Sequence, residues 1–157
     1  MSYENFEKAL ELAKKCKSYT VSGAKTEEII ESAASLLGLT FSRQNHDFYS
    51  TVGYLSFFGS EIYEIDPDDI DGILEGNSVA YALSERRHYA LPQEWLPIYF
   101  FDDGYLGCLD YSQLNEDGEP PVIMALCNGE KYVFVERVAE DLGDFILELV
   151  ERQLSMQ

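Results

Sequence analysis

The sequence has few of the residues on which most catalytic and metal-binding sites depend. Its 157 residues include two histidines, His46 and His88, and three cysteines at positions 16, 108 and 127. The cysteines are odd in number and lack any Cys-x-x-Cys or Cys/His spacing for zinc, so we expect reduced thiols in the core of a cytosolic protein. His46 directly precedes Asp47. Because adjacent side chains on a helix point about 100° apart, we predict that these two residues form no dyad.

Long apolar segments and familiar catalytic motifs are missing as well. No run approaches the ~20 apolar residues that cross a bilayer, and the N-terminus is a mixed-charge amphipathic segment rather than a signal peptide. The G-x-S-x-G, P-loop and G-x-G-x-x-G motifs do not occur. We therefore expect a soluble cytoplasmic protein without a membrane partner, and we assign no catalytic residue, no metal ligand and no cofactor.

Basic residues are scarce in one part of the chain only. Residues 1–43 carry six acidic and six basic side chains, whereas residues 44–157 carry 23 acidic and five basic ones. The later segment therefore holds the whole formal net charge of −18. Such a surface repels nucleic acid and anionic membranes and speeds the encounter with a basic partner. This argues against a nucleic-acid partner.

Composition and periodicity predict one globular domain over residues 1–157. The hydrophobic content of 46% and the aromatic content of 13% are those of a folded chain. Apolar residues at three- and four-residue spacings predict a first helix over residues 3–17. Thr26 is suited to cap a second helix that Gly38 ends, and a short helical turn is expected at residues 47–52.

The second part of the chain reads mainly as strands. A strand is expected over residues 54–65, then an acidic loop over residues 66–75 and a helix capped by Asn77 or Ser78. Two hairpins are expected around the turn pairs Asp103-Gly104 and Asn128-Gly129, before a last helix over residues 139–154. This order predicts an α+β fold with a single antiparallel β-sheet and helices packed mainly on one side.

Two groups of carboxylates are candidates for binding a basic partner. The denser group lies in the acidic loop and contains Asp66, Asp68, Asp69, Asp71 and Glu75. The second group is the pair Asp102 and Asp103 at the expected hairpin turn. The alternative interpretation is that these acids form a solvated face that keeps the protein soluble.

The acidic loop also resembles a calcium-binding loop, but its register is wrong. With Asp66 at the first position, Ile70 occupies the fifth, Asp71 stands where glycine is required, and Asn77 replaces the bidentate glutamate. A cation site of another type remains an alternative. A hydrolase with paired carboxylates is a further alternative, because the separation of two carboxylates cannot be read from the sequence.

Several segments, in their order, resemble one protein family. These are the helix at residues 26–37 with Gly38-Leu39, residues 46–53, residues 58–63, the helix at 77–87, the hairpin from Leu91-Pro92 to Asp110, Pro120-Pro121-Val122, and the final helix with Asp144-Phe145. Together, over about residues 26–150, they resemble the SUKH superfamily, named after the yeast Smi/Knr cell-wall-assembly regulators. The helix at residues 3–17 lies outside this resemblance as an N-terminal addition.

The resemblance implies a binding module with no catalytic residues. Bacterial members of the superfamily typically act as immunity proteins that neutralise a cognate polymorphic toxin, often a nuclease, whereas eukaryotic members act in cell-wall and signalling regulation. We therefore expect an immunity protein whose partner is a toxin with a basic surface. A regulatory or scaffold module for a cellular protein or small ligand is the alternative. The sequence leaves the oligomeric state open between monomer and homodimer.

Overall fold

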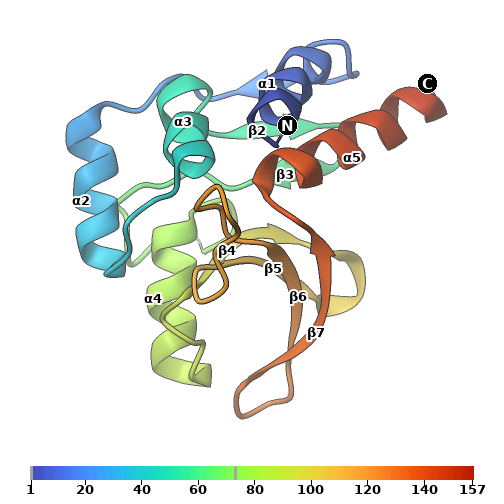
Figure 1. Ribbon diagram of the computed structural model, residues 1–157. Helices are drawn as coiled ribbons and strands as arrows, with labels where there is room; N and C mark the ends of the chain where they lie inside the picture. Colours follow the sequence, from blue (N-terminus) through green and yellow to red (C-terminus); the bar gives the residue numbers. More distant parts are fainter. Residues whose placement is uncertain (1, 73) are drawn as a thin grey trace.

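The computed structural model describes residues 2–72 and 74–157 and consists of helices and short strands (Figure 1). In chain order the elements are α1 (Ser2–Ala13), β1 (Thr20–Val21), α2 (Glu27–Leu37), α3 (Arg43–Thr51), β2 (Leu55–Phe57), β3 (Ser60–Ile62), α4 (Ser78–Tyr89), β4 (Trp95–Phe100), a 3₁₀ turn at Asp102–Gly104, β5 (Leu106–Asp110), β6 (Val122–Cys127), β7 (Tyr132–Ala139) and α5 (Leu142–Met156).

The α+β class and the antiparallel pairing are confirmed, but the strands form two sheets where one was expected. The first sheet has the order β1-β2-β3 and the second the order β4-β5-β6-β7. The segment expected as one strand over residues 54–65 turns back on itself, because Phe58 and Gly59 adopt positive φ angles of 39° and 89°. The sheets meet where the Tyr63 N–H donates to the Ile98 carbonyl at 2.9 Å.

The capping residues predicted from the sequence are found at the ends of α2 and at the start of α4. Thr26 caps α2 by accepting a hydrogen bond from the Ile29 N–H, and Gly38 ends this helix in the left-handed conformation. Asn77 caps α4. The expected helical turn at residues 47–52 is longer than predicted, since α3 begins at Arg43 after its cap, Ser42.

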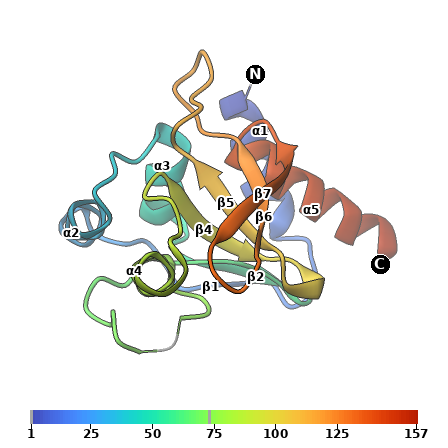
Figure 2. The ribbon, with the colours of Figure 1, turned by 90° about the horizontal axis from the view of Figure 1, so that it is seen from below.

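The helix α1 belongs to the hydrophobic core. Its residues Phe6, Ala9 and Ala13 are buried, and the helix lies beside α5 (Figure 1, Figure 2). The approach of the two helices is close at Gly143, where an added Cβ would lie 2.8 Å from the backbone nitrogen of Phe6. At the other end of the fold, α4 packs against β4. Within the described residues, no helix has both the length and the apolar character that crossing a membrane requires.

Candidate functional site

The acidic loop at residues 66–75 is held at both ends by α4 and its cap. The side chain of Asn77 accepts from the Asp66 N–H at 3.0 Å and donates to the carbonyls of Asp66 and Asp69 at 3.1 and 3.2 Å. The same Oδ1 accepts from the Val79 N–H at 3.1 Å, which caps α4. The Glu64 N–H donates to the Gly76 carbonyl at 2.9 Å. Thus one buried asparagine fixes both the helix start and the loop.

This anchoring creates a pocket of about 310 Å³ that we call the acidic pocket. Five carboxylates line it: Glu61, Glu64, Asp66, Asp69 and Glu75, together with Tyr54, Gly76 and Asn77. Three of these carboxylates were among the residues predicted from the sequence. Glu61 and Glu64 were not; they flank the buried pair Ile62 and Tyr63 just before the loop. No regular pattern in the sequence identifies them, because these two acids are three residues apart and lie outside the acidic run.

The other predicted carboxylates lie outside the acidic pocket. Asp68 and Asp71 are exposed on the loop and do not line the pocket, although the Asp68 N–H donates to the Asp66 carboxylate at 3.1 Å. Asp102 and Asp103 are exposed in the β4–β5 turn, where Asp103 has a φ of 67°. The structure therefore brings together Asp66, Asp69 and Glu75 but not the full predicted set.

The charge of the acidic pocket is poorly neutralised. Glu64 forms a salt bridge with Lys25, which follows the first strand β1. The other four carboxylates form no salt bridge with any described residue. Carboxylates that converge on one concave surface strengthen the local negative potential and attract cations. The pocket is therefore suited to a basic side chain of a partner.

A second hollow adjoins the acidic pocket, and we call it the aromatic pocket. It has a volume of about 260 Å³ and is lined by Tyr63, Leu74, Glu75, Tyr81 and Phe100. Glu75 lines both pockets. The rings of Tyr63 and Tyr81 stack with centroids 6.0 Å apart and planes 25° apart. Burial raises the pKa of both phenols, that of Tyr81 to about 12, so both hydroxyls stay neutral at physiological pH.

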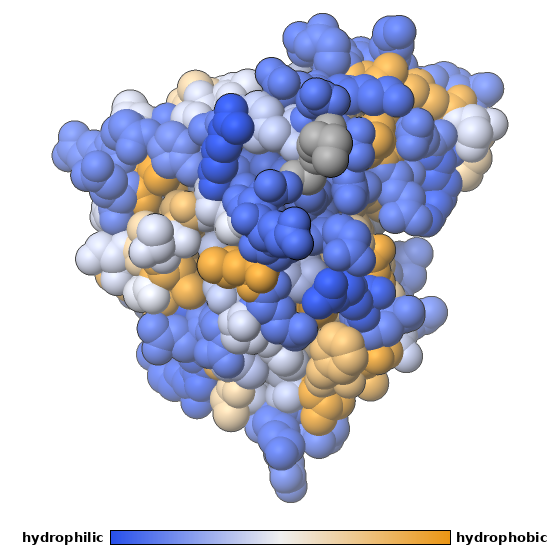
Figure 3. Space-filling view, in the orientation of Figure 1, coloured by the Kyte–Doolittle hydropathy of each residue, from blue (hydrophilic) through white to orange (hydrophobic). Residues whose placement is uncertain are grey.

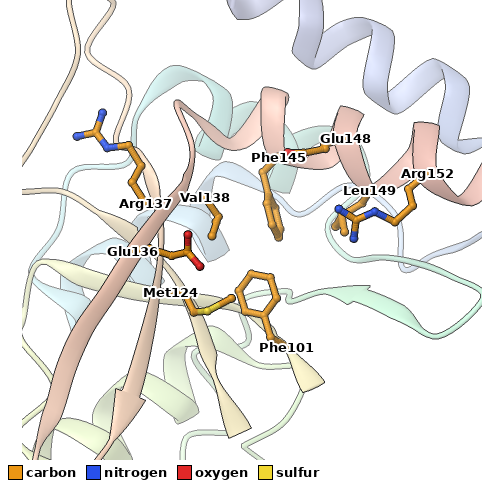
Figure 4. Close-up of a pocket in the computed structure, with 9 residues that line it drawn as sticks. All are labelled: Phe101, Met124, Glu136, Arg137, Val138, Phe145, Glu148, Leu149 and Arg152. Atoms are coloured by element: carbon orange, nitrogen blue, oxygen red, sulfur yellow. The ribbon is translucent and has the colours of Figure 1, made fainter. Parts of the chain in front are cut away.

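A third hollow, the α5 cleft, lies between the last helix and the four-stranded sheet (Figure 4). It has a volume of about 390 Å³, with apolar side chains contributed by Phe101, Met124, Val138, Phe145 and Leu149. In Figure 4 Glu136 points into the cleft and Arg152 reaches toward it from α5, while Arg137 points away. The sequence did not single out this cleft, because it forms only when α5 is laid over the sheet.

The prediction that His46 and Asp47 form no dyad is wrong. His46 Nδ1 lies 2.9 Å from Asp47 Oδ1, and His46 Nε2 is hydrogen-bonded to Glu27. The angle of about 100° separates the Cβ directions only, and rotation about the side-chain bonds brings the distal atoms together. Both ring nitrogens already have carboxylate partners, so His46 presents no free base. His88 is exposed, with Nδ1 at 2.9 Å from the Ser84 carbonyl.

The cysteines form no disulfide bond among the described residues. Cys16 and Cys108 are buried, Cys127 is partly buried, and all three are free thiols. Across residues 2–72 and 74–157, no three His, Cys, Asp or Glu side chains are arranged to hold a metal ion.

The comparison with protein families identifies the chain. Residues 6–151 match a family model described as SMI1-KNR4 cell-wall, which is a SUKH family. The chain therefore belongs to the SMI1-KNR4 (SUKH) family. The match begins at Phe6 and so includes most of α1, whereas the resemblance read from the sequence began at residue 26. No curated protein matches the chain.

Proposed function

We propose that this protein is a non-catalytic protein-binding module, namely an immunity protein that neutralises a cognate toxin through the toxin's basic surface. Its family is one often involved in immunity or regulation. The observation that carries the proposal is the convergence of five carboxylates on the acidic pocket with a single salt bridge, from Lys25 to Glu64, among the described residues. A nuclease must attract phosphates, so an inhibitor that displays carboxylates uses the same electrostatic field.

The proposal is tested first by identifying the partner. In bacteria the genes of an immunity protein and its toxin lie side by side, so the neighbouring reading frames are screened for a C-terminal toxin domain. Production of that domain alone should stop growth, and co-production of this protein should restore it. A toxin that remains lethal, together with no complex between the purified proteins, would refute the immunity function.

The binding surface is tested with variants of matched charge. In D66N/D68N/D69N/D71N, four loop carboxylates are neutralised, and association with the toxin at low salt should slow by about tenfold or more while the melting temperature stays nearly unchanged. The control E28Q/E116Q/E130Q/E151Q removes the same charge from exposed positions elsewhere. If both variants associate at the wild-type rate at low salt, the loop is not the binding surface.

A regulatory or scaffold module is the second candidate, and the α5 cleft favours it. A volume of about 390 Å³ with apolar walls and charged groups at the rim falls in the range of small-molecule sites. The immunity function and the regulatory function predict loss of function in different variants. Loss of function in M124R, which fills the cleft, with full function in the loop variant would favour the regulatory module.

A further inference from the structure

The aromatic pocket is unusual on so acidic a surface. Phe100 keeps 46% of its surface exposed at the end of β4, next to the stacked rings of Tyr63 and Tyr81. Other exposed apolar side chains lie elsewhere, such as Phe134 on β7, where Figure 3 shows apolar surface over β6 and β7. The aromatic pocket differs from that surface because it is concave and shares Glu75 with the acidic pocket.

The aromatic pocket offers a ligand its rings and one carboxylate. Tyr63 is 2% exposed, and its hydroxyl has no hydrogen-bond partner among the described residues. That hydroxyl oxygen has less than 1 Å² of accessible surface, so a ligand in the pocket does not reach it. The polar group open to a ligand is the carboxylate of the exposed Glu75.

The chemistry of the walls defines that ligand. Aromatic faces and a carboxylate together favour a cation. The guanidinium group of arginine is planar, weakly hydrated and rich in N–H donors, so it stacks on rings while it pairs with a carboxylate. Lysine offers a compact, strongly hydrated ammonium group that stacks less well.

The chain already contains one arrangement of this kind. The guanidinium carbon of Arg43 lies 3.6 Å from the ring centre of Tyr3. The hydroxyl of Tyr3 donates to the Asp47 carboxylate at 2.6 Å. An arginine, a tyrosine and a carboxylate thus contact one another here, as they would in the aromatic pocket. The difference is that this arginine belongs to the chain itself.

We infer that the aromatic pocket receives an arginine side chain of the partner, which stacks on Tyr81 and Phe100 and pairs with Glu75. The inference rests on the proposed function, since it names the residue type with which the basic partner enters. The carboxylates of the acidic pocket then attract the surrounding basic surface, while the aromatic pocket selects one residue.

The inference is tested on the full chain with Nα-acetyl-L-arginine methylamide as the probe, titrated while amide and aromatic NMR signals are recorded. The signals of Tyr81 and Phe100 should shift in a saturable manner. The citrulline analogue, which has the same shape without the charge, should bind at least tenfold more weakly, and the lysine analogue should bind several-fold more weakly. Shifts confined to other parts of the surface, or equal binding of citrulline, would overturn the inference.

Variants separate the contributions of the wall residues. F100A and E75Q should each weaken binding of the probe at least fivefold, whereas F134A removes an exposed phenylalanine elsewhere and should have no effect. Y63F removes only the buried hydroxyl, which the ligand does not touch, so it should leave binding unchanged. If E75Q and F100A both bind the probe as the wild type does, the pocket does not hold the guanidinium group.

The same variants separate this inference from the proposed function. A toxin complex whose affinity is unchanged in F100A and E75Q would leave the immunity function intact and overturn the assignment of the pocket. Probe binding that E75Q and F100A weaken, in a protein that protects against no toxin, would support the pocket and refute the immunity function.

Discussion

The Nδ1 atom of His46 lies 2.9 Å from the Oδ1 atom of Asp47, within a group of charged side chains that joins three helices. Asp47 also accepts a hydrogen bond from Tyr3 on α1 at 2.6 Å, and the other ring nitrogen of His46 is bonded to Glu27 on α2. Arg43 lies over the Tyr3 ring and 4.0 Å from the Asp47 carboxylate. The adjacent residues His46 and Asp47 therefore connect α3 to both α1 and α2.

This group should make stability depend on pH through His46. The hydrogen bond to Asp47 raises the pKa of His46, Glu27 adds to the effect, and burial opposes it. Burial acts to raise the pKa of Asp47, but the hydrogen bonds from Tyr3 and His46 outweigh it and lower that pKa. The folded-state pKa of His46 is raised, so protonated His46 adds to the free energy of unfolding. This stabilisation is fully present below the ordinary pKa of about 6.5 and is lost as pH rises through the raised pKa of the folded state.

We therefore expect H46Q to be less stable than the wild type at pH 6 by a few tenths to about 1 kcal/mol, the range for partly exposed ion pairs. The difference should shrink by pH 9, where both proteins lack the charge. Urea unfolding at both pH values measures it. The control H88Q removes an exposed histidine and should leave the pH profile unchanged. If the wild type became more stable than H46Q by an amount that grows with pH, the prediction would be contradicted.

The contact between α1 and α5 leads to a second prediction. In G143A the new methyl group would lie 2.7 Å from Phe6 Cβ and 2.8 Å from Phe6 N, so the two helices must move apart. Overpacking of this kind costs about 1–3 kcal/mol, which urea unfolding would detect. The control E151A changes an exposed residue of the same helix. Equal stability of G143A and E151A would show that α1 does not pack tightly on α5 in solution.

The sequence predicted the fold wherever local chemistry decides the structure. The caps Thr26 and Asn77 and the positive φ angles of Asp103 and Gly104 depend on a few neighbouring residues, and all are observed. The turn at Phe58 was missed because a phenylalanine rarely adopts a positive φ, so aromatic composition alone predicted a continuous strand. The result is a second sheet where one had been expected.

The candidate site was predictable only in part. The loop carboxylates form a run in the sequence, so Asp66, Asp69 and Glu75 could be identified before the structure. The aromatic pocket could not, because Tyr63, Tyr81 and Phe100 come from a strand end, a helix and another strand. Their convergence depends on the packing of α4 against β4, and no linear pattern records it.

The crowding of carboxylates in the acidic pocket leads to a third prediction. E61Q/D69N/E75Q removes mutual repulsion, so we expect it to be more stable than the wild type at low salt by a few tenths to about 1 kcal/mol. Added salt screens the repulsion and should reduce the difference. Thermal unfolding across a salt series measures this effect, and E28Q/E116Q/E130Q serves as the control of equal charge. A difference that does not depend on salt, or is equal in the control, would contradict local repulsion.

The last prediction concerns Asn77, which joins the start of α4 to the acidic loop. N77A removes the acceptor for the Asp66 and Val79 N–H groups and the donor to the Asp66 and Asp69 carbonyls, so it should lower stability by about 2–3 kcal/mol. N77D keeps the acceptor and loses the donor. Hydrogen exchange should therefore speed up at both Asp66 and Val79 in N77A, whereas Val79 should stay protected in N77D.

Binding of the proposed toxin partner would then show what the anchored loop contributes. Both Asn77 variants release the loop, so both should weaken the complex, even though N77D adds a carboxylate beside the acidic pocket. The control N128A removes an asparagine that accepts from the Glu130 and Lys131 N–H groups in the β6–β7 turn, and it should leave the complex unchanged. Tighter binding by N77D would mean that total charge, rather than the fixed arrangement of the carboxylates, determines affinity.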